Sequence, residues 1–365
     1  GQMIDAIQNG GYDPHKVALL ITQTGGGCRA SNYIHMLRKA LEKAGLDYIP
    51  VLSLSFGLEK NPGFHWTVGL IRRLIYGMMY GDLIMNVANQ VRPYEVSAGD
   101  TTAKVEFWTS ELLNRFDRGE GMSRKKMRGI FEEICADFKS IPVTGEEKVR
   151  VGVVGEILVK YMPVANNHLV ELLEREGAEA VVPDLMDFFN YSFYGGFFKH
   201  RYLGLKWTSS AVARLVVSAI RVARGPAIDA LSRSRRFEAP MPIEQIAALA
   251  EPFLAQGNQY GEGWFLAGEM AELLTTGVSN IVCIQPFACL PNHVVGKGVI
   301  KKLRAHYPDA NIVAVDYDPG SSEANQLNRL KLMLAVAKKK AAQVHKPAEA
   351  AHSAAAQATP MSAEA

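Results

Sequence analysis

The chain has 365 residues, of which 48% are hydrophobic and 21% charged, and its formal net charge at pH 7 is +3. These values are typical of a globular protein with one large or two smaller domains. The small net charge argues against nucleic acid or a membrane surface as a partner. Because no signal peptide or membrane-spanning run is recognisable, the four cysteines are expected to be reduced thiols in the cytoplasm rather than a disulfide scaffold.

The first predicted unit is a strand, a glycine-rich loop, a helix and a second strand. Residues 16–22 (KVALLIT) have the apolar pattern of a buried parallel strand, and a Gly-Gly-Gly-Cys loop follows at 25–28. Apolar residues recur at helical spacing over 34–44, and Gly45 stands where a C-terminal cap is expected. Residues 48–55 then predict the second strand. This order is that of a βαβ unit.

The middle of the chain is expected to be rich in helices. Residues 62–140 carry amphipathic helical spacing, and a second α/β unit begins with a strand at 149–158. A helix at 169–175 and a strand at 178–183 follow. The segment 188–202 is rich in aromatic residues and glycine, which predicts an irregular functional or interface segment.

The C-terminal part repeats the pattern of the beginning. Helices are expected around 210–223 and 242–255, and strands at 280–284 and 311–315. The loop after the first of these strands contains Cys289, and a helix marked by residues 295–303 separates the two strands. A closing helix is expected over 323–339.

The predicted fold class is α/β, with two flavodoxin-like or Rossmann-like doubly wound domains, parallel sheets and extra helices. The polar stretch before residue 149 marks the boundary between a first domain, 1–147, and a second, 148–340. The first domain is expected to be truncated at its N-terminus, so that the chain is a piece of a longer protein. Residues 341–365 have the composition of a disordered tail.

Two cysteines occupy equivalent positions in this scheme. Cys28 and Cys289 each lie in the loop between a parallel strand and the next helix. Backbone N–H groups and the helix dipole at such a position favour a thiolate and an anionic thiolate-ligated group. The alternative is an ordinary buried cysteine. Cys135 and Cys283 lie on a helix face and within a strand, where packing alone accounts for them.

A dinucleotide site is the main rival interpretation of the first loop. Gly25, Gly27 and Ala30 satisfy the spacing G-x-G-x-x-A between a strand and a helix. That fingerprint also requires an acidic residue at the end of the second strand, whereas Asp47 precedes the strand. The rival predicts a flavin spectrum or stabilisation by NAD, and no iron.

Three strings resemble the large activase-fused relatives of the 2-hydroxyacyl-CoA dehydratase and benzoyl-CoA reductase family. They are residues 24–33 (TGGGCRASNY), 285–293 (QPFACLPNH) and 316–329 (DYDPGSSEANQLNR), and the resemblance extends over most of residues 12–340. It implies an iron–sulfur cluster, [4Fe–4S] or double-cubane, with Cys28 and Cys289 as ligands.

The resemblance also implies a function. An ATP-dependent activase, as a domain or a subunit, would supply a low-potential electron for radical dehydration or reduction of an acyl-CoA or a small molecule. Gly26, Gly27 and Arg29 would lie at the cofactor, Glu156 and His293 are candidate catalytic groups, and a dimer or a longer chain is expected. Neither nucleic acid nor a membrane is an expected partner.

The chain departs from the family pattern in two respects. The family uses three cysteine ligands, whereas only two loop cysteines are found here, and no activase ATP-binding motif is present. A lyase or a reductase component therefore stands beside an alternative from another class, a non-catalytic docking module for an activase or dehydratase partner with no bound metal. The metal content distinguishes these hypotheses.

Overall fold

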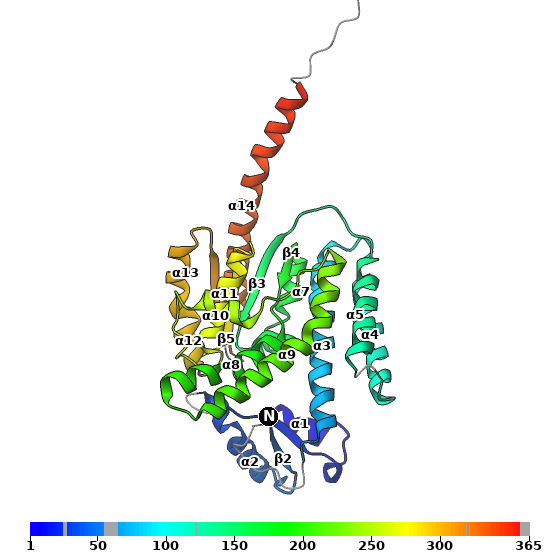
Figure 1. Cartoon of the computed structure of the whole chain (residues 1–365), viewed down its shortest axis with the longest axis vertical. Coiled ribbons are helices and arrows are strands. Elements are labelled where there is room, and N and C mark those ends of the chain that lie inside the picture. Colours follow the sequence, from blue (N-terminus) through cyan, green and yellow to red (C-terminus); the bar gives the residue numbers. More distant parts are fainter. Residues whose placement is uncertain (25–27, 55–64, 121–122, 319, 321, 358–365) are drawn as a thin grey trace, which may run out of the picture.

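The computed structural model describes residues 1–24, 28–54, 65–120, 123–318, 320 and 322–357. Helices surround two parallel β-sheets, so the protein has the predicted α/β fold (Figure 1). No described helix is long and apolar enough to cross a membrane.

The N-terminal unit is the predicted βαβ unit with a helix before it. Its elements are α1 (Gln2–Asn9), β1 (Leu19–Thr22), α2 (Tyr33–Lys43) and β2 (Val51–Leu54). Strand β1 pairs with β2 in parallel, Leu19 opposite Val51. A small core of its own, centred on Ile7, Leu41 and Ile49, holds this unit together. Gly45 follows α2 with φ +69°, as the predicted cap requires.

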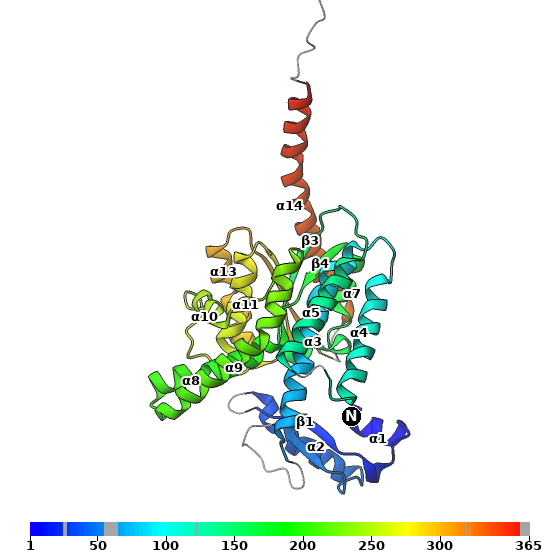
Figure 2. The same ribbon diagram turned by 45° about the vertical axis from the view of Figure 1, so that its right-hand side comes forward.

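The predicted helical segment forms three long helices. They are α3 (Val68–Val91), α4 (Asp100–Asp117) and α5 (Arg124–Lys139). Fully buried Phe131 of α5 belongs to a core that these helices share with α8 (Leu185–Leu203) and α9 (Trp207–Ser234). Figure 2 shows α3, α5 and α9 side by side. The domain boundary at residue 147 stays a prediction, and the helices before it pack on helices that follow it.

The larger sheet has four parallel strands in the order β4-β3-β5-β6. They are β3 (Val149–Gly155), β4 (Ala178–Val181), β5 (Asn280–Pro286) and β6 (Asn311–Tyr317). From β3 the chain turns to one side to form β4 and then returns to the other side to form β5 and β6. The order therefore reverses between β3 and β5, as in a flavodoxin-like sheet.

Helices cover both faces of this sheet. Alternate residues of β3 point to opposite faces and pack on different helices. Val151 and Val153 pack on one face with α7 (Leu169–Arg175) and α14 (Glu323–Gln357). Val154 packs on the other face with the remaining sheet-covering helices, which are α11 (Gly263–Thr275), α12 (Leu290–Val295) and α13 (Ile300–His306). Two further helices are α6 (Ile157–Tyr161) and α10 (Ile243–Ala250).

The expectation of an irregular segment at 188–202 was wrong, because these residues belong to α8. The glycines there serve close helix packing instead of breaking the helix. A Cβ atom on Gly196 would lie 2.7 Å from the Cβ atom of Ala213 in α9. Asn190 and Tyr191 are among the buried residues of this helix.

The closing helix extends further than the composition predicts. Leu330, Met333 and Leu334 of α14 pack on the sheet. The helix then continues through Gln357, projecting from the body in Figure 1. The predicted tail therefore contains helix as far as residue 357, and residues 358–365 lie outside the described residues.

Candidate functional site

The candidate site lies where β3 and β5 end, at the point where the strand order reverses. Gly155, the last residue of β3, adopts φ +148°, and the next N–H, that of Glu156, donates to the carbonyl of Ile284 at 2.9 Å. Strand β5 leads directly into the loop that carries Cys289. In doubly wound sheets ligands bind in the crevice at this position.

The Cys289 loop has a strained backbone. Cys289 stands at the N-cap of α12, and its N–H donates to the carbonyl of Pro286 at 3.2 Å. Ala288, immediately before it, has φ +58°. This left-handed conformation costs a non-glycine residue about 1–3 kcal/mol and occurs most often at functional sites.

Cys28 comes from the N-terminal unit, at the end of the β1 loop. The Ser31 hydroxyl donates to the Cys28 carbonyl at 2.6 Å, and the Gln23 amide donates to the Ser31 carbonyl at 3.1 Å. Gln23 in turn accepts a hydrogen bond from Ser53 on β2 at 3.0 Å. These hydrogen bonds connect Cys28, through Ser31 and Gln23, to strand β2.

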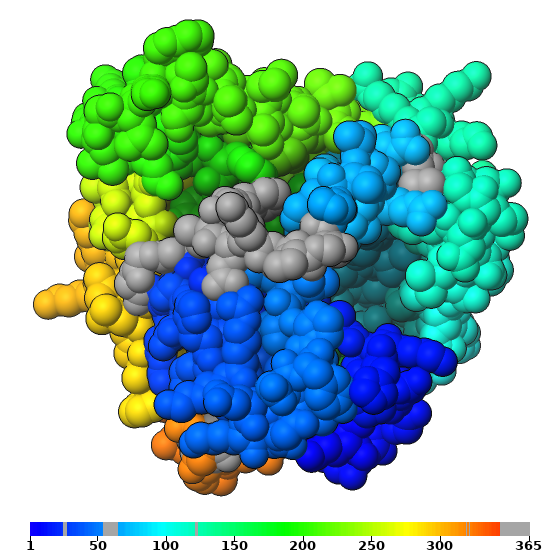
Figure 3. All heavy atoms as spheres, turned by 90° about the horizontal axis from the view of Figure 1, so that it is seen from below, coloured from blue at the N-terminus to red at the C-terminus, as the bar shows by residue number. Residues whose placement is uncertain are grey.

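The two loop cysteines lie within electrostatic range of each other. Both thiols are partly buried, and Cys28 is near enough to contribute to the raised pKa of Cys289. Tyr33, at the start of α2, is affected by both cysteines and by Glu156. Burial raises the pKa of its hydroxyl, and Cys28, Glu156 and Cys289 raise this pKa further, whereas Arg29 lowers it. In the view from below, the blue N-terminal unit lies across the centre of the face, with part of the yellow-orange C-terminal half beside it (Figure 3).

Burial opposes the thiolate that the helix position of Cys289 favours. Burial raises the pKa of its thiol to about 11, and Glu262, Glu156 and Cys28 act in the same direction. The backbone N–H of Asn292 lowers the pKa, as the helix position predicts, but burial is the larger effect. A metal ion binding here would have to displace a proton from the Cys289 thiol.

Two carboxyl groups approach this site from α6 and α11. Glu156 caps α6, its carboxylate accepting from the Val159 N–H at 2.9 Å, and Glu262 accepts from the Ile157 N–H at 3.1 Å. Burial raises the pKa of Glu156, and burial together with Glu156 raises that of Glu262 to about 7. Glu156 was predicted from the sequence as a candidate catalytic group. Glu262, which lies 106 positions further along the chain, was not predicted.

We expect Glu262→Gln to flatten the pH dependence of stability. The folded pKa of about 7 lies above the unfolded value near 4.5, so wild-type protein loses stability as the pH rises from about 4.5 through 7. Glutamine keeps an acceptor for Ile157 but cannot ionise. Urea unfolding at pH 5 and pH 8 should show a pH-dependent loss that is smaller in the variant by about 2–3 kcal/mol. An equal loss in both proteins would contradict the assignment.

His293 holds the Cys289 loop instead of facing it as a free proton donor. Its Nδ1 lies 2.8 Å from the Cys289 carbonyl oxygen, and its Nε2 lies 3.1 Å from the Lys297 ammonium group. That ammonium group also binds Asp316 at 2.6 Å. Burial alone would raise the pKa of Asp316, but Lys297, Gln285 and His293 together hold it below its usual value. These contacts hold the Cys289 loop, and the catalytic role of His293 stays a prediction.

The other sequence predictions fall in different places. Arg29 is exposed at the start of a short 3-10 turn, whereas Gly26 and Gly27 lie outside the described residues. Cys135 and Cys283 are buried, and burial raises the pKa of each thiol to about 12, as suits structural cysteines.

One feature of the site gave no sequence signal. Asn292 of α12 is fully buried, and neither its side-chain oxygen nor its nitrogen has a hydrogen-bond partner in the described part of the chain. Leaving such a group unpaired costs about 1–3 kcal/mol. It stands three residues after Cys289, in the helix that the cysteine begins.

Among the described residues, no three His, Cys, Asp or Glu side chains are grouped so as to hold a metal ion. Comparison with known proteins adds no assignment: no protein-family model, curated protein or solved structure matches this chain.

Proposed function

We propose that this protein binds an iron–sulfur cluster, [4Fe–4S] or double-cubane, through Cys28 and Cys289. One observation supports the proposal: Cys28 and Cys289, 261 positions apart in the sequence, lie within electrostatic range of each other, and Cys289 follows β5 beside the point where the strand order reverses. Ligand sites of doubly wound sheets lie at this crevice. Thiolates are the usual ligands of iron–sulfur clusters.

The residues present fit part of a cluster site. The two thiols are partly buried rather than enclosed, and the helix that begins at Cys289 contains the unpaired Asn292 amide. A bound cluster would supply one-electron redox chemistry, and two protein thiols would leave further iron positions to another ligand or a substrate. The described residues group no third ligand with the pair.

The surrounding side chains would serve such a site in distinct ways. His293, Lys297 and Asp316 fix the backbone of the Cys289 loop. Burial raises the pKa of both Glu156 and Glu262, and that of Glu262 lies at about 7, so near pH 7 Glu262 can hold or release a proton. These properties suit a site that passes electrons and protons to a bound substrate.

The wider role proposed follows from the sequence resemblance. The cluster would accept a low-potential electron from an ATP-dependent activase, in the cytoplasm, and act in radical dehydration or reduction of an acyl-CoA or a small molecule. Partly buried ligands at a crevice, open to a partner and a substrate, support this role.

The test is metal content. We expect protein purified without oxygen to contain stoichiometric iron and acid-labile sulfide with broad visible absorption. Cys28→Ala and Cys289→Ala should each lose most of the iron, whereas Cys135→Ala, which removes a buried thiol from α5, should retain it.

Two outcomes would overturn the proposal. Iron retained by both loop variants would place the ligands elsewhere. Iron-free wild-type protein that also resists reconstitution would instead support a metal-free docking module, which should still bind an activase partner in a pull-down assay.

A further inference from the structure

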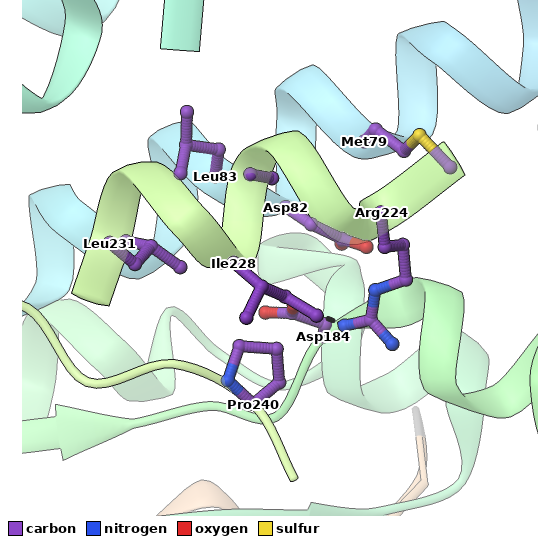
Figure 4. A pocket seen from close by; sticks show the side chains of 9 residues that line it. Met79, Asp82, Leu83, Asp184, Arg224, Ile228, Leu231 and Pro240 are labelled. Carbon is purple, nitrogen blue, oxygen red and sulfur yellow. Dashed lines mark hydrogen bonds and ion pairs between the residues drawn. The ribbon is translucent and has the colours of Figure 1, made fainter. Parts of the chain in front are cut away.

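A second cavity lies along β4, the edge strand of the larger sheet. It includes about 670 Å³ of space, counting open solvent at its mouth, and is formed by α3, the end of β4, residues 238–240 and the end of α11. A smaller cavity of about 290 Å³ adjoins it and shares Asp184 and Pro240 (Figure 4). None of the residues of the cysteine site lines either cavity.

The wall of the larger cavity is acidic. Four carboxyl side chains line it, and Arg150 is its only cationic lining residue among the described ones; the acids are Asp184, Asp187, Glu238 and Glu272. Arg150 is already bound to Glu238 and, at 3.2 Å, to Glu179. A carboxyl group left without a cation in this wall would favour a positively charged occupant.

Glu272 is the carboxyl group that lacks a cation. Asp184 and Asp187 both bind the Arg224 guanidinium, whereas no described Lys or Arg nitrogen lies within ion-pair distance of Glu272. Its carboxylate accepts from the Met241 N–H at 3.3 Å. Burial and the nearby Asp187, Glu269 and Asp184 raise its pKa to about 8, although the hydrogen bond from Met241 lowers it. A cation bound beside this carboxyl group would favour its ionised form.

Asn89 gives an independent indication of a ligand. It lines the cavity from α3, its exposed fraction is only 7%, and its side-chain amide makes no hydrogen bond with any described residue. Its neighbours Asn86 and Gln90 are instead hydrogen-bonded to each other at 2.6 Å. The donor and acceptor of Asn89 are therefore available to a ligand inside the cavity.

The lining also limits the kind of cation. Val181, Val182 and Leu273 supply an apolar wall suited to methylene groups. A metal ion requires converging ligands, and no described His, Cys, Asp or Glu side chains form a group of three suited to one. An anion would meet the four carboxyl groups.

We propose that this cavity binds a small aliphatic amine or guanidine, with its cationic end on Glu272, its methylene chain on the apolar wall and a further polar group on Asn89. This site is separate from the cysteine site and does not depend on a cluster.

Titration calorimetry and thermal unfolding of the full chain at pH 8.5 test the proposal, with putrescine, cadaverine, agmatine and arginine as probes. At least one probe should bind saturably with unit stoichiometry and raise the Tm. Glu272→Gln should weaken its binding at least tenfold and Asn89→Ala severalfold. Exposed Glu251, changed to glutamine, provides a matched control that should bind as wild type does.

Each variant must unfold cooperatively without ligand, and Asn89→Ala keeps the test valid should Glu272→Gln fold poorly. Equal affinity of Glu272→Gln and wild type would overturn the proposal. It would also fail if no probe bound, or if MgCl₂ or inorganic phosphate stabilised the protein while the amines did not.

Discussion

Arg224→Met is expected to lower the free energy of unfolding by about 3–5 kcal/mol, because it leaves buried carboxylates without their cation. The Arg224 guanidinium, with 9% of its side chain exposed, binds Asp187 and, at 2.8 Å, Asp184. Figure 4 shows it reaching from α9 toward Asp184. Burial raises the pKa of Asp82 in α3, and Arg224 lowers it. The Asp82 carboxylate accepts from the Leu185 and Met186 N–H groups at 2.9 Å each and so caps α8.

Arg221 provides a matched control on the same helix. Its ion pair with Glu244 is exposed, at 60% and 41% of the two side chains, so Arg221→Met should cost no more than about 1 kcal/mol. Urea unfolding followed by circular dichroism at pH 7 measures both variants. Similar losses for Arg221→Met and Arg224→Met would show that the buried ion network does not stabilise the fold.

Gly155→Ala should be at least as damaging as a large core truncation, with an expected loss of about 3 kcal/mol or more. A Cβ atom at this position would lie 1.8 Å from the carbonyl oxygen of Ile284, and φ +148° is unfavourable for any side chain. The clash would separate β3 from β5 and displace Glu156. Iron binding should therefore fall together with stability.

Gly145→Ala is the control for this substitution. A Cβ atom on Gly145 would meet nothing within 4 Å, and the residue is exposed. Unfolding by urea and iron content should both stay close to wild type, with a stability change within about 1 kcal/mol. Wild-type stability of Gly155→Ala would contradict the close approach of the two strands.

Patterned segments were predictable because burial on one side leaves a period in the sequence. The helix expected at 169–175 matches α7 at both ends, and the strand expected at 280–284 is the first part of β5. The cysteine positions followed from the same reasoning, since strand ends mark the edge of a sheet.

Other features gave no such pattern. Helix α11 was missed because it is buried almost all round, from Trp264 to Leu273, so no polar face alternates with an apolar one. Glu262 joins the site only through packing between distant segments, and the burial of Asn292 beside Cys289 leaves no mark in the sequence. The sequence also contains nothing that distinguishes the left-handed Ala288 from an ordinary alanine.

The two cysteines lie in loops that follow strands of different sheets, and the N-terminal sheet has its own small core. In the proposed cluster-bound state, the cluster would cross-link Cys28 to Cys289 and so close a loop of 261 residues. Chain-entropy arguments give such a closure about 5–6 kcal/mol. Oxidative loss of the cluster should then release residues 1–54 first, so that amide hydrogen exchange and proteolysis at the N-terminal unit would report the redox history of the protein.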